Sequence, residues 1–212
     1  MRLKNRLGVI FFVVFIDFLG LSFILPLYPE LADRFGLSAT ALALLAASYA
    51  LMQFIFSPLL GRISDKIGRK PVLAISSLGT AASFIFFGLA TTTWMLFLSR
   101  ILNGIFGSSA AAAQAYIADV TGRHERTEGM GVMGAALGLG LIFGPVLSAF
   151  LGSFGLSGPA LGAAAITFLN SAFILFFLKE SLAQESRIHT GKLKLLSVGL
   201  KGFKEVLKQP IM

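Results

Sequence analysis

The sequence predicts an all-α membrane protein with six transmembrane helices. Hydrophobic residues make up 56% of its 212 residues and charged residues only 13%, whereas a soluble domain has about 25% charged residues. Six apolar runs follow one another along the chain, and each approaches the roughly 20 residues that a helix needs to cross a bilayer. We therefore expect a six-helix bundle over residues 1–180 and a basic cytoplasmic segment over 181–212.

The six predicted spans are 7–29, 39–60, 72–90, 94–117, 129–152 and 159–178. The segments between them, such as "YPELADRFG", "GRISDKIGRKP" and "GSFGLSGP", are rich in the Gly, Pro, Ser and Asp residues that form turns. The first run is too long for a cleaved signal peptide, and it contains Asp17.

The positive charges predict the orientation of the bundle. Of the 18 lysines and arginines, all except Arg34 and Arg100 fall in the N-terminus, the second and fourth connections, and the C-terminal segment. Cytoplasmic segments of membrane proteins carry an excess of such cations. Both termini are therefore expected in the cytoplasm.

The C-terminal segment has a helical pattern of its own. Apolar residues recur there every three or four positions and lysines flank them: Leu193, Leu196, Leu200, Phe203 and Leu207, with Lys192, Lys201, Lys204 and Lys208. This pattern fits an amphipathic helix on the inner leaflet, and it fits equally a basic linker.

Two other classes of protein are excluded. A nucleic-acid-binding surface needs one contiguous basic face, which six separate spans do not provide. An enzyme is not expected, because no nucleophile–base pattern is present and both histidines, His124 and His189, lie in loops. There is no cysteine and no pattern of metal ligands, so no metal is expected.

Two charged residues lie inside predicted spans, where charge is costly and usually functional. Asp17 is in the first span and can serve as a proton carrier, and Arg100 is in the fourth and can bind an anionic group. Alternatively, the two pair with each other or reach toward the membrane surface. Further polar residues within the spans either join helices or line a substrate site: Tyr49, Gln53, Asn103, Gln114 and Asn170.

Several motifs resemble those of the major facilitator superfamily. "GRISDKIGRKPVL" is similar to the family's loop between helices 2 and 3, with all defining positions present: Gly61, Asp65, Lys66, Gly68, Arg69 and Lys70. Asp17, Gly20, Pro26 and Pro29 match the first-span motif of drug–proton antiporters, in which Ser22 replaces a second glycine.

The fourth and fifth spans carry the other two signatures. Arg100 and Gly104 match the R-x-x-x-G signature in span 4. Gly140, Gly144 and Pro145 match the antiporter signature in span 5, where Ser148 and Ala149 replace the closing glycines. Close packing of helices through such glycines is common in membrane proteins. The nearest likeness is to tetracycline and multidrug exporters.

The resemblance implies the N-terminal half of a major facilitator fold, built from two inverted three-helix repeats. It implies proton-coupled efflux of small amphipathic compounds across a bacterial inner membrane, with the proton gradient as energy source and no cofactor. Asp17 would exchange the proton, and Arg100 would tune the acidity of Asp17 or bind the substrate. Asp65, Arg69 and Asp119 would form a charge cluster that latches one conformation. Some tetracycline exporters carry an acid within the third span. This chain has none there, so tetracycline itself is not favoured as substrate.

Two alternatives remain open at this point. The chain could belong to a sugar or metabolite transporter of the same superfamily, although the span 5 signature argues against this. It could also be a truncated membrane protein that does not transport alone. To transport a substrate, a six-span chain would need a separate C-terminal half or a second copy of itself.

Overall fold

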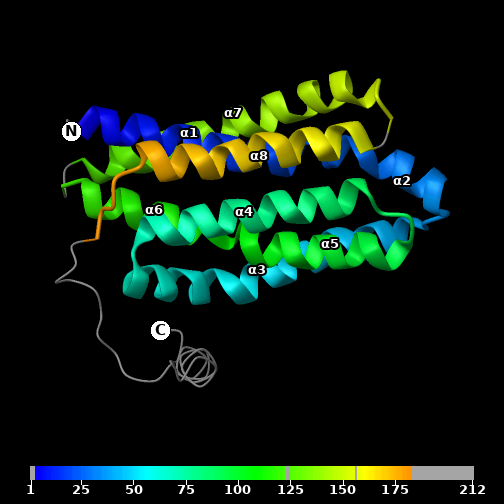
Figure 1. The fold of residues 1–212 in the computed structure, drawn as a ribbon, viewed down its shortest axis with the longest axis horizontal. Helices are drawn as coiled ribbons and strands as arrows, with labels where there is room; N and C mark the ends of the chain where they lie inside the picture. Colours follow the sequence, from blue (N-terminus) through cyan, green and yellow to red (C-terminus); the bar gives the residue numbers. More distant parts are fainter. Residues whose placement is uncertain (1–2, 123–124, 156, 183–212) are drawn as a thin grey trace, which may run out of the picture.

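A computed structural model describes residues 3–122, 125–155 and 157–182. The described residues form a bundle of long helices that run roughly parallel or antiparallel (Figure 1). Within the described ranges, six helical stretches are long and apolar enough to cross a membrane. The predicted amphipathic segment at 190–209 lies outside the described residues.

The first and fourth spans are each broken by a short 3₁₀ turn. The first span consists of α1 (Leu3–Ser22), η1 (Leu25–Leu27) and α2 (Tyr28–Phe35). Pro26 and Pro29 stand at the first turns of η1 and α2, where a missing N–H is tolerated. The fourth span consists of α5 (Thr93–Phe106), η2 (Gly107–Ser109) and α6 (Ala110–Val120).

The other four spans are single helices: α3 (Ala39–Ile67), α4 (Arg69–Gly88), α7 (Arg126–Gly152) and α8 (Ser157–Phe177). The first two spans are longer than the sequence predicted. The first continues beyond residue 29 to Phe35 and ends at Gly36, which has a φ of 62°. The helix α3 continues beyond residue 60, and only Gly68 separates it from α4. At 1.5 Å per residue α3 is about 44 Å long, more than the roughly 30 Å of a bilayer's hydrocarbon core.

The helix contacts follow a two-fold pattern. Span 1 packs against span 5 (α1 with α7), span 2 packs against span 4 (α3 with α5), and span 3 packs against span 6 (α4 with α8). If span 1 is exchanged with span 4, span 2 with span 5, and span 3 with span 6, the same three pairs of contacting spans result. Because each repeat has three spans, the second repeat enters the membrane from the opposite side. The bundle is therefore built from two inverted three-helix repeats.

The start of α1, the α3–α4 turn and the end of α8 lie at one end of the bundle, which we call the near end (Figure 1). One cluster of buried apolar residues lies toward this end and includes Ile10, Tyr116 and Ile174. A second lies toward the far end and includes Phe23, Phe84 and Leu96. The Asp17 site described below lies between the two.

Candidate functional site

A cleft between α1, α3, α4 and the fourth span contains Asp17. Its polar lining comes from Asp17, Tyr49, Gln53, Thr80, Asn103 and Ser109, and its apolar lining includes Val14, Phe18 and Phe84. Asp17 is half-buried in α1. Its Oδ1 accepts a hydrogen bond from Asn170 Nδ2 (2.9 Å), and its Oδ2 accepts one from Ser109 Oγ (3.2 Å). The carboxylate is therefore held by donors from two other spans.

The side chains opposite Asp17 form a small polar network. Gln53 Nε2 donates to Tyr49 Oη (2.9 Å) and to the carbonyl oxygen of Gly107 (3.3 Å). A side chain at Gly104 would collide with the backbone of Tyr49, so this glycine is what lets α5 approach α3. Gln114 is exposed on α6 and is not among the residues that line the cleft.

Arg100 lies close to this network but does not pair with Asp17. Its side chain is buried, and its guanidinium carbon lies 5.4 Å from the ring centre of Tyr49 and 5.5 Å from that of Phe87. Both distances fall within the range of cation–π attraction. Nε and Nη1 of Arg100, and Nδ2 of the neighbouring Asn103, have no hydrogen-bond partner among the described residues. The predicted alternative of an Asp17–Arg100 pair is not seen among the described ion pairs.

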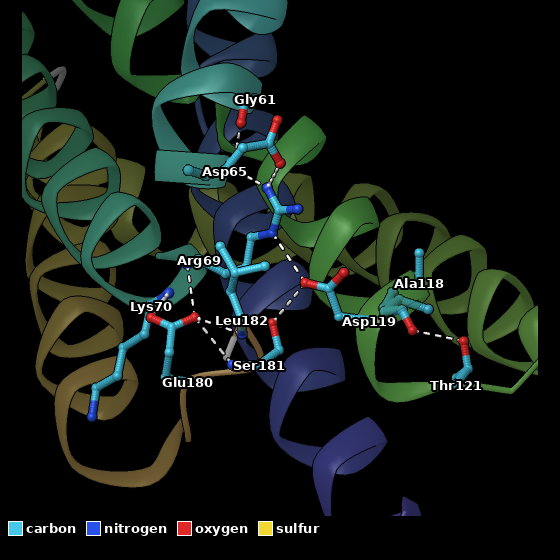
Figure 2. Close-up of polar contacts among 12 residues, drawn as sticks. Gly61, Asp65, Arg69, Lys70, Ala118, Asp119, Thr121, Glu180, Ser181 and Leu182 are labelled. Carbon is cyan, nitrogen blue, oxygen red and sulfur yellow. Dashed lines mark hydrogen bonds and ion pairs between the residues drawn. The ribbon is translucent and has the colours of Figure 1, made fainter. Parts of the chain in front are cut away.

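At the near end, Arg69 binds two carboxylates from different spans (Figure 2). Its Nη1 lies 2.5 Å from Asp65 Oδ1, and its Nε lies 3.1 Å from Asp119 Oδ2. Nη1 also donates to Ser64 Oγ (2.6 Å). The structure thus brings together three residues of the predicted latch, which we call the Arg69 cluster.

Gly68 and the backbone carbonyl of Gly61 place Arg69 at this position. Gly68 has a φ of 113°, a conformation that side-chain-bearing residues rarely adopt, and it allows α4 to start directly after α3. The carbonyl oxygen of Gly61 accepts a hydrogen bond from Ser64 Oγ (2.6 Å), which holds the hydroxyl that Arg69 contacts. The side chain of Lys70 extends away from the cluster (Figure 2).

Sequence reasoning missed Glu180 and Ser181, which follow α8. The Glu180 carboxylate accepts hydrogen bonds from the backbone N–H groups of Arg69 (2.9 Å) and Lys70 (3.2 Å), at the start of α4. It also accepts from the N–H groups of Ser181 and Leu182. Ser181 Oγ donates to Asp119 Oδ2 (3.0 Å). Figure 2 shows this segment beside the Arg69 cluster. Glu180 is the first acid after the last span, and this position is the sequence signal that could have identified it.

Four glycines in the middle of span 5 divide into two sets. Side chains at Gly140 and Gly144 would overlap α1, whereas those at Gly134 and Gly138 would meet nothing within 4 Å. Pro145 follows within the same helix α7. The antiporter-signature glycines are thus the ones that let α1 and α7 come into backbone contact.

The described residues contain no group of three or more His, Cys, Asp or Glu side chains that could hold a metal ion. The arrangement is suited instead to exchanging a proton at a carboxylate in the membrane interior and to holding an ionic cluster at the near end.

Comparisons with known proteins give consistent results. The chain is similar to the "Tetracycline resistance protein, class E" of Escherichia coli, with 42% identity over 172 residues, covering 80% of this chain and 42% of that protein. It is also similar to "Multidrug resistance protein 2" of Bacillus subtilis (strain 168), with 37% identity over 175 residues, covering 82% of this chain and 44% of that protein. The chain therefore spans less than half the length of these curated relatives.

Among solved structures, the chain resembles the human organic anion transporter MFSD10 (TETRAN), with a TM-score of 0.79 and 26% identity. The match covers 90% of this chain and 51% of that one. A bacterial homolog of the human lysosomal transporter Spinster shares the fold, with a TM-score of 0.76 and 17% identity, over 98% of this chain and 50% of the other.

The family model described as the Major Facilitator Superfamily matches residues 10–212. This match, the six apolar helices and the two-fold pattern of contacts agree on a multi-pass membrane protein rather than an enzyme. The chain belongs to the Major Facilitator Superfamily, and its fold is that of the N-terminal half of such a protein.

Proposed function

We propose that this chain is the N-terminal half of a proton-coupled exporter of small amphipathic compounds. The observation that carries the proposal is Asp17, a carboxylate in the membrane interior that lines a cleft together with Tyr49, Gln53 and Asn103. An acid in such a position is a functional residue by default. The names of relatives that confer tetracycline and multidrug resistance support export as the direction of transport.

The proton gradient supplies the energy in this proposal, and Asp17 exchanges the proton. Arg100 lies against Tyr49. Its Nε–H and Nη1–H groups, which have no hydrogen-bond partner among the described residues, would attract an anionic or carbonyl group of the substrate, or the guanidinium would act on Asp17 through Tyr49. The near end, which carries most of the cations, faces the cytoplasm of a bacterial cell, and both termini lie on that side.

The Arg69 cluster is proposed as a conformational latch. Its bonds join the ends of spans 2, 3 and 4, so any rearrangement that separates these ends must break the bonds of Arg69 to Asp65 or Asp119. Such a cluster favours one conformation over another by the free energy of those contacts.

A C-terminal six-helix half, or a second copy of this chain, would complete the cleft. The match to less than half of each relative favours this requirement. It also supports the second reading, in which this chain alone inserts in the membrane but does not transport.

Dye uptake into everted membrane vesicles, which corresponds to efflux from the cell, tests both readings. The vesicles would carry the chain alone or together with a six-helix C-terminal half, and uptake would be measured before and after an ionophore collapses the pH gradient. Asp17→Asn is expected to abolish gradient-driven uptake and to leave membrane insertion intact. Asp33→Asn is the matched control, because Asp33 is an exposed acid in α2, outside the cleft. Full uptake by the Asp17→Asn protein would refute the proton role.

A further inference from the structure

The two oxygens of Asp17 have different kinds of partner. Oδ1 accepts from Asn170 Nδ2 on α8, and Oδ2 accepts from the hydroxyl of Ser109 at the break between α5 and α6. An amide NH₂ group can only donate a hydrogen bond, whereas a hydroxyl can donate or accept. The two oxygens are therefore not equivalent when the carboxylate takes up a proton.

The backbone of α1 fixes the orientation of the Asn170 amide. Asn170 is fully buried, and its Nδ2 donates both to Asp17 Oδ1 and to the carbonyl oxygen of Val13 (3.1 Å). A backbone carbonyl can only accept, so it requires the NH₂ group on this side whether Asp17 is charged or neutral. Rotating the amide would place its own oxygen against the Val13 oxygen. Asn170 is therefore a fixed donor to Oδ1.

Ser109 is on the side of Asp17 that faces the cleft. Ser109 and Asp17 both line this cleft, whereas Asn170 is not among its lining residues. A proton that arrives from water in the cleft thus meets Oδ2 first. Ser109 can then reverse its hydrogen bond and accept from the new O–H group.

We propose that Asp17 carries its proton on Oδ2, opposite Ser109, and that Asn170 is a positioning residue that holds Oδ1 in both charge states. On protonation, the proton passes from cleft water to Oδ2, and the Ser109 hydroxyl changes from donor to acceptor. The Asn170 bond to Oδ1, now the carbonyl oxygen of the acid, persists. On release, the same proton returns to water and Ser109 donates again. This inference rests on the proposed function, in which Asp17 exchanges the proton.

Other charged or titratable groups on the surrounding helices are placed differently. Tyr49 is the one that shares the cleft lining with Asp17, and Arg100 lies against Tyr49 and Phe87. The helix α8, from Ser157 to Phe177, has no titratable side chain. The remaining groups whose side chains are described on α1, α3, α4, α6 and α7 belong to the near-end portions of those helices: Arg6, Arg62, Asp65, Lys66, Arg69, Lys70, Tyr116, Asp119, Arg126 and Glu128.

Infrared spectroscopy of the full chain in phospholipid vesicles can tell which oxygen carries the proton. The carbonyl stretch of a protonated carboxyl comes from the oxygen without the proton, and accepting a hydrogen bond lowers its frequency. The band of Asp17 would be assigned by its loss in Asp17→Asn. If Oδ2 carries the proton, Asn170→Leu removes the donor to the carbonyl oxygen and raises the frequency, whereas Ser109→Ala leaves it close to that of the parent protein.

Thr167→Val is the matched control for Asn170→Leu. Thr167 is fully buried one turn earlier on α8, and its hydroxyl has no hydrogen-bond partner among the described residues. Removing this hydroxyl is expected to leave the Asp17 band unchanged. Tyr49→Phe, at the other titratable group in the cleft, is also expected to leave the carbonyl frequency unchanged.

The opposite pattern, a shift with Ser109→Ala and none with Asn170→Leu, would place the proton on Oδ1 and overturn the inference. Equal shifts in both variants, or a shift in neither, would overturn it as well. If Asn170→Leu does not insert in the membrane, Ser109→Ala decides alone, because a raised frequency there contradicts the assignment. If Asp17→Asn removes no band at any pH tested, both this inference and the proposed proton role are wrong. A band with the wrong pattern overturns only the inference.

Discussion

Replacing Glu180 by alanine is expected to loosen the first turn of α4. The helix begins at Arg69, and its N-cap residue, Gly68, has no side chain with which to cap it. The Glu180 carboxylate serves this purpose from the end of the last span by accepting the N–H groups of Arg69 and Lys70. A lost side-chain cap costs about 1 kcal/mol, and a hydrogen bond to a charged acceptor contributes about 1.5–3 kcal/mol.

A local loss of about 2 kcal/mol follows for Glu180→Ala, which corresponds to a roughly 30-fold change in an opening equilibrium. Hydrogen exchange with mass spectrometry, on the chain in lipid nanodiscs, measures this quantity. The amides of Arg69 and Lys70 are expected to exchange about 30-fold faster in Glu180→Ala. A smaller change is expected in Glu180→Gln, which keeps one acceptor oxygen but loses the charge that favours a helix N-terminus.

The control is Glu125→Ala, which removes a near-end acid whose carboxylate, among the described residues, accepts a hydrogen bond only from the nearby N–H of Gly122 (3.2 Å). This variant is expected to leave the exchange of α4 unchanged. Unaltered exchange at the start of α4 in Glu180→Ala, with the protein properly inserted, would refute the capping role. Faster exchange in both variants would show a general effect of lost negative charge rather than a cap.

Two further predictions concern helix packing and the Arg69 cluster. A methyl group at Gly144 would overlap the Ser22 side chain, so Gly144→Ala is expected to destabilise the bundle by about 1–3 kcal/mol in detergent-induced unfolding. Gly138→Ala, which faces open space, is expected to have no such effect, and equal losses in both would contradict the packing argument. Arg69→Lys replaces a guanidinium that contacts two carboxylates by a single ammonium group. Because those carboxylates are partly exposed, the expected loss is only about 1–2 kcal/mol in the same assay, and an unchanged unfolding midpoint would contradict it.

The sequence was sufficient to predict the six-helix fold because hydrophobicity and length alone specify a transmembrane helix. Helix ends were harder to predict. The helix α3 extends through "GRISDKI" to Ile67, although the glycine and charges there suggested a turn. A polar helix is stable beyond the bilayer, since its backbone bonds are satisfied internally and its charged side chains reach water. In that stretch, only Gly68 interrupts the helices.

The partners of the site residues could not be predicted, because they depend on how distant spans pack. The Asn170 contact with Asp17 joins residues 153 positions apart. Asn170 was identified as a polar residue in an apolar span, but nothing in the sequence states which face of α8 meets α1. Ser109 lies at a 3₁₀ break that interrupts an otherwise continuous helical pattern. Gln114 was considered for the substrate site but is exposed on α6. The reason is the same, because the sequence does not state which face of α6 meets the other spans.

Two of the departures from the family's glycine patterns acquire a joint explanation in the structure. Ser22 and Ser148 are both buried, and they bond across the same interface in opposite directions. Ser22 Oγ on α1 donates to the carbonyl oxygen of Gly140 on α7 (2.8 Å), and Ser148 Oγ on α7 donates to that of Phe23 (2.7 Å). A hydroxyl inside a membrane protein needs an acceptor. Ser22 has one on α7, and Ser148 has one in the turn directly after α1.

These reciprocal bonds have a consequence for the proton exchange at Asp17 proposed above. Sliding of α7 along α1 would break both of these serine bonds. Ser22 would keep its second acceptor, the carbonyl oxygen of Leu19 (3.1 Å), whereas the buried Ser148 hydroxyl would lose its acceptor, which is costly. The two helices are therefore expected to move as one body. Asp17 lies five residues before Ser22 on α1, about 7.5 Å along the helix axis. A movement of α7 against the rest of the bundle would thus carry the Asp17 carboxylate away from Asn170 and Ser109, which are on other spans. In this way the packing of span 5 against α1 is expected to affect the hydrogen bonds of Asp17, the proposed site of protonation.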